Sequence, residues 1–240
     1  MNIVISQPML FPWVGLLEQI RLADVFVHYD DVQFSKGSFT NRVQIKTASG
    51  LNWMTIPLEG YKFGQAINEV RTQPYENWMT RHLGLMEQSF KDAPYEADAM
   101  KMVLDVYSQS YDNIGMLARQ SMLALAEYFG LLDNTKLIDV TSMDISGSSS
   151  QRVLEIVKSL NGTCYISGHG ARKYLSHDLF ESEGIQVAYM DYQSAPYPQN
   201  HGVFTPFVSG LDLVAHCGRK GSNYIRSNTT NWKDFIHEPD

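Results

Sequence analysis

The sequence has 240 residues, a formal net charge of −7 at pH 7, and a hydrophobic fraction of 44%. This composition is typical of a folded globular protein and excludes a disordered chain. A protein that holds DNA by its phosphates usually presents a basic face, and no strongly basic stretch is present. We therefore expect no DNA partner.

Metal binding, secretion and membrane insertion are not indicated either. Cys164 and Cys217 fit neither a disulfide framework nor a clustered metal-ligand spacing, and no His-x-x-x-His motif occurs, so we expect no metal. The sequence starts without a basic segment followed by an apolar run, and it lacks a stretch of about 18 apolar residues. These features predict a cytoplasmic protein that does not insert into a membrane.

The first thirty residues alternate between strand and helix patterns. Residues 3–5 and 25–29 read as short buried strands, and residues 16–22 show helical spacing between them. Such a βαβ unit gives a parallel sheet, in which ligands bind beyond the carboxyl ends of the strands. Ser6-Gln7-Pro8 and Asp30-Asp31 follow the two strands, so the sequence predicts a binding site at this edge.

The middle of the chain has a different character. Residues 38–58 predict a hairpin, residues 61–74 an irregular or strand-like excursion, and residues 76–130 a helical segment. The three helices expected in that segment cover residues 77–90, 96–110 and 114–129.

The second half returns to the alternation of strands and helices. The expected strands are 137–140, 164–167 and 185–190, and the expected helices are 153–160 and 175–182. An apolar helix is expected to begin near Ser209, and the polar tail after Cys217 is expected to fray in part. The fold class predicted is α/β, a parallel-type sheet built from βαβ units with a helical insertion in the middle, in one domain over residues 1–240.

Polar and aromatic residues after the first two strands are the first candidates. Gln7 and Trp13 lie in a Pro-rich loop that could wall a substrate site, although its aromatic residues could equally plug the end of the sheet. Asp30 or Asp31 could bind a hydroxyl or an amine, or act as a general base. Adjacent carboxylates on an extended chain point to different sides, so the two would not act as a close pair. Their alternative role is a solvated turn with a helix or loop N-cap.

The hairpin region supplies further polar candidates. Lys36, Asn41, Arg42 and Lys46 could donate hydrogen bonds to phosphate or carboxylate groups. The alternative is a solvated hairpin face that carries a few basic residues.

The strand at 164–167 runs into Ser167-Gly168-His169-Gly170, which is a Gly-x-Gly turn with Arg172 shortly after it. Such a turn exposes backbone N–H groups to an anion, but the third glycine of a dinucleotide-binding fingerprint is missing. His169 is a candidate acid–base residue. Its alternative role is that of a hydrogen-bonded loop histidine.

The last candidates lie in a long polar and aromatic loop before the apolar helix. Tyr197 and Gln199 could contact a substrate, because long ordered loops in compact domains are often functional. His201 is a second candidate acid–base residue, with a plain surface histidine as the alternative.

These motifs together resemble the WbqC-like protein family over nearly the whole chain. The resemblance rests on Gln7-Pro8, Phe11-Pro12-Trp13 and Gly15, on Ala23-Asp24, on Asp30-Asp31-Val32-Gln33-Phe34, on Lys36, Asn41-Arg42, Ile45-Lys46-Thr47 and Trp53, on Tyr165-Ile166-Ser167-Gly168 and Tyr174-Leu175, and on Tyr197-Pro198-Gln199 through Ser209 and Asp212. The family commonly has a His before the Gln-Pro pair, where this chain has Ser6. A catalytic role of that His therefore does not carry over.

The resemblance implies a place in the synthesis of O-antigen or related bacterial surface glycans. It favours an enzyme that transfers an acyl or aminoacyl group to the amino sugar of a nucleotide-linked sugar, with a charged tRNA or a carrier protein as a candidate donor. It also implies that Gln33 contacts the substrate. One alternative is an ATP-dependent, amide-forming ligase of nucleotidyltransferase-like fold, which rests on fold analogy alone. A second alternative is a non-catalytic protein that binds a sugar nucleotide or acts as a scaffold.

Overall fold

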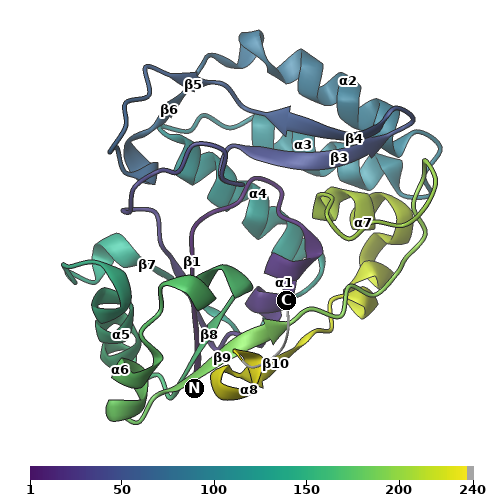
Figure 1. The fold of residues 1–240 in the computed structure, drawn as a ribbon. Coiled ribbons are helices and arrows are strands. Elements are labelled where there is room, and N and C mark those ends of the chain that lie inside the picture. The colour runs from purple at the N-terminus through teal and green to yellow at the C-terminus, as the bar shows by residue number, and fades with distance from the viewer. Residues whose placement is uncertain (237–240) are drawn as a thin grey trace.

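The computed structural model describes residues 1–236, and its centre is a six-stranded sheet in the order β10-β9-β8-β1-β2-β7 (Figure 1). All neighbouring strands are parallel except β10, which pairs antiparallel with β9. The strands are β1 (Asn2–Ser6), β2 (Val25–His28), β7 (Lys136–Asp139), β8 (Cys164–Ser167), β9 (Gln186–Asp191) and β10 (Asn228–Asn231). The predicted α/β class with a mostly parallel sheet is confirmed.

Helices cover both faces of this sheet, as a parallel sheet requires. The face that carries Val4 packs against α1 (Val14–Leu22), α4 (Ile114–Tyr128) and α7 (Gly210–Cys217). The face that carries Ile3 and Ile5 packs against α5 (Ser149–Ser159), α6 (His177–Ser182) and α8 (Trp232–Phe235). Successive residues of β1 therefore enter two different cores, because side chains along a strand alternate between the faces.

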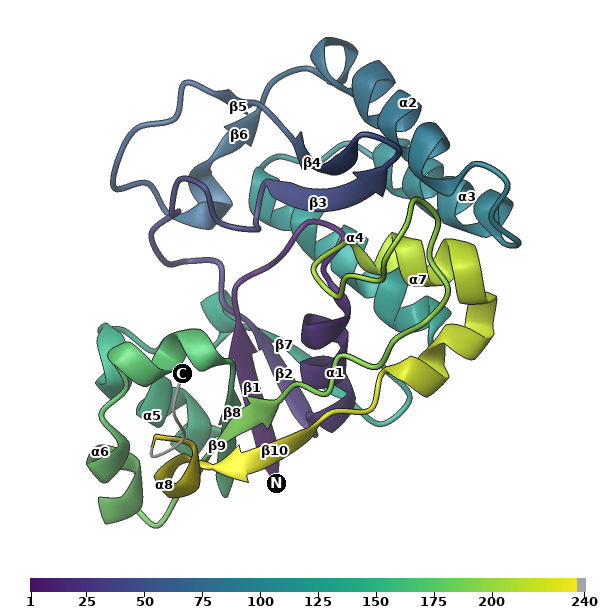
Figure 2. The same ribbon diagram turned by 45° about the vertical axis from the view of Figure 1, so that its right-hand side comes forward.

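The predicted helical segment is present and follows a hairpin, β3 (Arg42–Thr47) with β4 (Gly50–Thr55). A second strand pair joins β5 (Leu58–Glu59) to β6 (Arg71–Thr72), and β6 lies within residues 61–74, the stretch expected to be irregular or strand-like. α2 (Met79–Phe90) and α3 (Glu96–Tyr107) then precede α4. Figures 1 and 2 show the hairpin, α2 and α3 together on the side toward which the carboxyl ends of the parallel strands point.

The expectation of a partly frayed tail after Cys217 is wrong for residues 218–236. A 3-10 segment (Gly218–Tyr224) leads into β10, which adds a strand to the sheet edge, and α8 follows it. Phe235 stacks on Tyr189 with ring centroids 4.4 Å apart, and Trp232 stacks on His177 at 4.5 Å. These two aromatic contacts fix a segment whose polar composition gave no packing signal. Residues 237–240 lie outside the described part of the chain.

The strand order has a direct consequence for ligand binding. Counting the parallel strands along the chain as one to five, their order across the sheet is 5-4-1-2-3, so the direction of winding reverses between β1 and β8. In open parallel sheets the loops beyond the carboxyl ends separate at such a reversal and leave a crevice. By this rule, we expect a ligand-binding crevice above β1 and β8.

Candidate functional site

Two of the loops predicted to bind a ligand leave the sheet at the strand reversal, where the crevice is expected. β1 and β8 pair in register, with Val4 opposite Ile166, so Ser6-Gln7 and Ser167-Gly168 leave the sheet at the same level. Ser167 is buried and its hydroxyl accepts a hydrogen bond from Tyr165 at 3.4 Å. Four of the predicted substrate-binding residues are thereby brought to one place: Gln7, Ser167, Gly168 and Gly170.

An aromatic and amide cluster lies beside this crevice. The Tyr192 ring lies 5.0 Å from that of Trp13 and 4.9 Å from that of His169, measured between centroids. Gln19 donates its amide to the Tyr192 hydroxyl at 3.0 Å. Burial raises the pKa of Tyr192 to about 12, so the phenol stays protonated at neutral pH. These groups link α1 to the loops after β8 and β9.

The two glycines of the Gly-x-Gly turn have different surroundings. A Cβ atom at position 168 would lie 2.9 Å from the Gln19 amide nitrogen and 3.1 Å from the Tyr192 hydroxyl, whereas nothing lies within 4 Å of one at position 170. A side chain at position 168 would therefore have to displace the Gln19 amide that bonds Tyr192. Gly170 faces open space, so its lack of a side chain leaves the backbone accessible to a ligand.

His169 is exposed at this crevice and its ring is held in a defined orientation. Nε2 lies 2.6 Å from the carbonyl oxygen of Met190, and because a carbonyl only accepts, Nε2 must carry the proton. The ring also packs on Phe235, with centroids 4.7 Å apart. In the neutral ring this tautomer leaves Nδ1 unprotonated, which is the state that a general base requires.

The two predicted catalytic aspartates are both ion-paired. Asp31 receives a two-pronged hydrogen bond from Arg152 on α5, at 2.9 and 2.5 Å. Asp30 accepts from Arg119 on α4 at 2.6 Å, and the other arm of Arg119 reaches Asp139 at 2.7 Å. Burial raises the pKa of Asp30 despite this partner. Both carboxylates therefore tie the end of β2 to neighbouring helices, and a base role for either stays a prediction.

Two further groups at the ends of β2 and β7 extend this charged cluster. His28 is buried, and burial together with nearby Arg119 lowers its pKa to about 4, so it is neutral at pH 7. The pKa of Asp139 is lowered to about 2, because bonds from Thr141 and Arg119 outweigh the opposing effect of its burial. The cluster is a set of paired structural charges with one neutral histidine.

The hairpin candidates divide into structural and exposed groups. Asn41 is buried and donates its amide to the carbonyl of Ile56 at 2.9 Å, which joins the ends of β3 and β4. Arg42 donates to the carbonyl of Gly37, and its guanidinium lies 4.1 Å from the centroid of the Trp53 ring. Lys36 and Gln33 are exposed, and Gln33 forms a β-bridge with Ala66.

The structure places the side chain of Arg172 beside Phe235 and Ile236. It donates to the carbonyl of Ile236 at 2.9 Å, and its guanidinium lies 5.3 Å from the centroid of the Phe235 ring. It thus contacts the C-terminal segment, and a contact with substrate stays a prediction.

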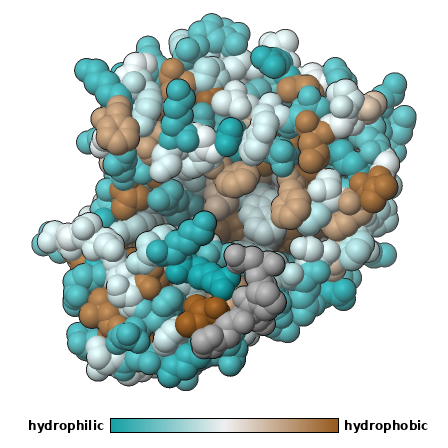
Figure 3. Space-filling view, viewed as in Figure 1, coloured by the Kyte–Doolittle hydropathy of each residue, from teal (hydrophilic) through white to brown (hydrophobic). Residues whose placement is uncertain are grey.

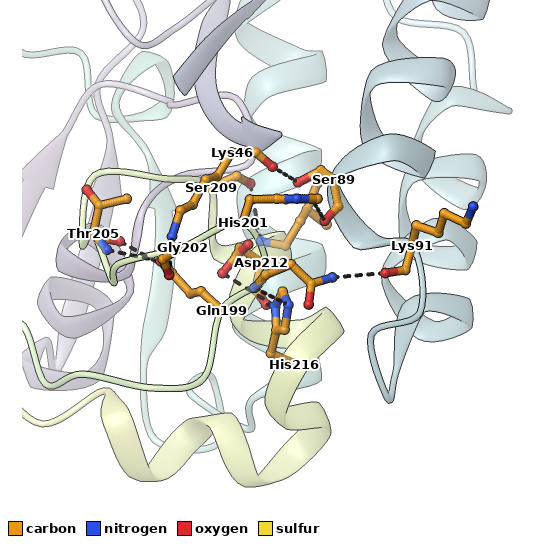
Figure 4. Close-up of polar contacts among 12 residues, drawn as sticks. Lys46, Ser89, Lys91, Gln199, His201, Gly202, Thr205, Ser209, Asp212 and His216 are labelled. Carbon is orange, nitrogen blue, oxygen red and sulfur yellow. Dashed lines mark hydrogen bonds and ion pairs between the residues drawn. The ribbon is translucent and has the colours of Figure 1, made fainter. Parts of the chain in front are cut away.

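The loop that contains Tyr197, Gln199 and His201 is fixed by a buried lysine (Figure 4). Lys46 on β3 donates to the Gln199 side chain and to the Gly202 carbonyl, each at 3.2 Å, and also to the Val203 carbonyl. Gln199 in turn bonds the backbone of Thr205 through both ends of its amide, at 3.0 Å each. Gln199 is therefore placed as a loop anchor, and any contact with substrate stays a prediction.

Asp212 and His216 of α7 lie beneath this loop (Figure 4). His216 donates from Nδ1 to the Asp212 carbonyl at 2.8 Å, and its Nε2 accepts from the Asn200 amide at 3.0 Å. Burial lowers the pKa of His216, but the Asp212 carboxylate reverses this and the net direction is upward. Burial beside Asp212 raises the pKa of Tyr197 well above its usual range, which keeps this predicted substrate residue a neutral core phenol.

The structure does not bring the two candidate acid–base histidines together. Nε2 of His201 lies 3.1 Å from the carbonyl oxygens of both Gln88 and Ser89 on α2. His201 lines a separate cavity of about 580 Å³ at the far end of β3, with Thr47 and Lys91. Only His169 lies at the strand reversal.

Some residues of the site had no readable signal in the sequence. Arg119 is the one basic residue of α4 and Arg152 is one of two on α5, and nothing local links them to Asp30 and Asp31. Tyr192 could have been predicted from the sequence. It follows β9, which was expected as a strand, and it therefore lies at the same edge of the sheet as the other candidates.

Residues 1–236 contain neither a metal-binding site nor a membrane-spanning helix. No group of three or more His, Cys, Asp or Glu side chains in this range is arranged to hold a metal ion. None of its helices combines the length and the apolar character that a membrane span requires.

Comparison with known proteins identifies the family of this α/β chain. Residues 7–224 match the WbqC-like protein family, so the chain belongs to that family. It is 30% identical over 228 residues to the Mycobacterium tuberculosis protein named "Uncharacterized protein Rv1507c", with 94% of this chain and 97% of that protein covered. No solved structure matches the chain.

Proposed function

We propose that the chain is a cytoplasmic transferase of bacterial O-antigen or surface-glycan synthesis, which moves an acyl or aminoacyl group onto the amine of a nucleotide-linked amino sugar. One observation carries this proposal. Ser6-Gln7 and Ser167-Gly168-His169 meet where the winding of a parallel sheet reverses, which is the usual place for a nucleotide in such folds. The family membership supports the same class of substrate.

His169 is the base in this proposal. The sugar amine attacks the carbonyl carbon of the donor and loses a proton to Nδ1 of His169. The new C–N bond replaces the bond between that carbon and the leaving group, and His169 passes the same proton to the leaving group as it departs. The hydrogen bond from Nε2 to Met190 holds the ring and its tautomer during this step. The Trp13 and Tyr192 rings supply the apolar wall on which a sugar ring can stack.

The first experiment is product analysis by mass spectrometry. Purified protein is mixed with UDP- or dTDP-linked amino sugars and an acyl-coenzyme A, and the mass gain of the acyl group on the sugar nucleotide is measured. We expect a product with the native protein. We expect His169→Gln to lower kcat by about 100-fold or more with little change in KM.

His201→Gln is the matched control, because His201 also donates to backbone carbonyls but lies in the other cavity. It should keep near-native turnover. An equal loss of kcat in the two variants would contradict the assignment of His169 as the base. An acylated product that forms only with added ATP, together with AMP, would identify a ligase. Binding without turnover would identify a scaffold.

A further inference from the structure

An apolar cavity of about 330 Å³ adjoins the crevice and is not used in the proposed roles. Three segments form it: the loop between β1 and α1, the β3–β4 hairpin with the turn before it, and the loop before α7. The lining side chains are Met9, Leu10, Pro12, Trp13, Phe39, Val43, Gln44, Trp53 and Phe207. In the view of Figure 3, apolar side chains gather in the hollow between the part with β3 and β4 and the part with α5 and α6.

The chemistry of the lining limits what can enter. Gln44 is the one amide in the wall, and none of the nine lining residues is charged. A sugar or a nucleobase buried here would leave most of its hydroxyl or edge groups without partners, at a cost of roughly 1–3 kcal/mol for each group. A hydrocarbon chain has no polar groups to leave unpaired, and burial of its apolar surface is favourable.

The cavity and the crevice share a wall. Trp13 lines the cavity, and its ring also lies 5.0 Å from Tyr192, which in turn lies 4.9 Å from His169. A molecule with an apolar end in the cavity would therefore extend its other end past Trp13 toward His169. This is the geometry that a donor needs when its reactive carbonyl must meet the base.

We propose that the cavity binds the aliphatic chain of an acyl donor, which makes the transferred group a short-chain acyl rather than an aminoacyl group. This inference rests on the proposed transferase function. Phe207 is 62% exposed at the opening of the cavity, whereas Val43 is buried at its floor. Phe207 then covers the distal carbons of the chain, so its size affects long acyl groups more than acetyl.

The test uses Trp13 and Trp53, two of the four tryptophans, as reporters inside the cavity. Their fluorescence is measured while the protein is titrated with acetyl-, butanoyl- and hexanoyl-coenzyme A. Affinity is expected to rise about threefold to fourfold for each added methylene while the chain stays within the cavity. Equal affinity for the three thioesters would overturn the assignment, since coenzyme A alone would then explain binding.

The Phe207→Ala variant should bind hexanoyl-coenzyme A about tenfold more weakly than the native protein, and its affinity for acetyl-coenzyme A should be nearly unchanged. Phe63→Ala is the matched control, because Phe63 is 88% exposed and lines no part of the cavity. The same loss in both variants would overturn the inference. So would a dimer, seen by sedimentation, that dissociates on Phe207→Ala, because the occupant would then be a second copy of the chain.

The outcomes separate this inference from the proposed function. Chain-length-dependent binding without an acylated sugar product would support the acyl cavity and reject the transferase. Product formation at equal efficiency with acetyl and hexanoyl donors, without any chain-length preference in binding, would support the transferase and reject the cavity assignment.

Discussion

The Trp13 ring lies directly against the backbone of Gly15, so that a Cβ atom at position 15 would fall 2.3 Å from the ring. Trp13 lines the apolar cavity and also contacts Tyr192, and Gly15 lets its ring pack against the first turn of α1. An aromatic ring therefore covers position 15 at the start of α1.

The Gly15→Ala variant tests this contact. A glycine-to-alanine change inside a helix alone stabilises by about 0.5–1 kcal/mol, but here the added methyl must displace Trp13. We expect net destabilisation in thermal unfolding and altered tryptophan fluorescence.

Gly84→Ala is its control. Gly84 lies within α2, and nothing lies within 4 Å of a Cβ atom there. This variant should gain the full helical benefit. Stabilisation by both variants would show that the ring moves freely.

The Asp31–Arg152 pair gives a second prediction, about structure rather than catalysis. The two side chains are 24% and 8% exposed, and the pair joins the end of β2 to α5. Removal of one partner from a pair this buried costs about 3–5 kcal/mol, because the other charge is left uncompensated.

A double-mutant cycle measured by urea unfolding tests this, with the variants Asp31→Asn, Arg152→Met and both together. We expect a coupling free energy of about 1–3 kcal/mol between the two residues. Losses that add independently would refute the structural role. Asp31 would then return as a candidate base.

Acid stability should depend on His82. Burial lowers its pKa to about 4, with a further contribution from nearby Arg81, and the hydrogen bond to the Thr55 carbonyl only partly opposes this shift. In the neutral ring, Nε2 donates to the Thr55 carbonyl and Nδ1 accepts from the Tyr107 hydroxyl. The unfolded chain binds this proton near pH 6.5 and the folded protein does not, so stability is lost as the pH falls from about 6.5 to about 4. The expected loss over this range is about 3 kcal/mol.

His82→Gln should make the unfolding free energy less dependent on pH in this window, whatever its effect at pH 7. The difference between native and variant slopes is the quantity to measure. Glu18 and Asp30 have raised pKa values and act in the opposite direction, but they are present in both proteins. Identical slopes would contradict the assignment.

Lys46→Met should loosen the loop at residues 199–205. Its ammonium group meets three acceptors of this loop, and each charged hydrogen bond contributes about 1.5–3 kcal/mol. We expect a loss of about 2–4 kcal/mol and faster proteolysis near His201. The exposed Lys62→Met serves as the control and should change stability by less than about 0.5 kcal/mol. Unchanged proteolysis in Lys46→Met would argue that α7 holds the loop without it.

Local pattern was enough to predict the parallel strands, the hairpin and the three middle helices. It was also enough to place Gln7, Ser167 and Gly168 at strand ends, because strand ends are marked by short apolar runs that stop at polar residues. The strand order was not predictable, since it depends on which distant strands pair.

The same limit applies to the side-chain partners. Asp31 and Arg152 are 121 residues apart, and nothing in either local sequence identifies the other. The β10 strand was missed because Asn228–Asn231 is entirely polar, and its place is set by pairing with β9.

The most direct test of where the nucleotide-linked sugar binds is hydrogen–deuterium exchange with and without a saturating UDP- or dTDP-linked amino sugar. A bound ligand slows exchange of the backbone that it covers or stabilises. We predict slower exchange in residues 6–13 and 166–171, the loops that follow β1 and β8. Slower exchange only around residues 47–49, 88–92 and 200–201, which line the cavity beside His201, would contradict the assignment of the site to the strand reversal.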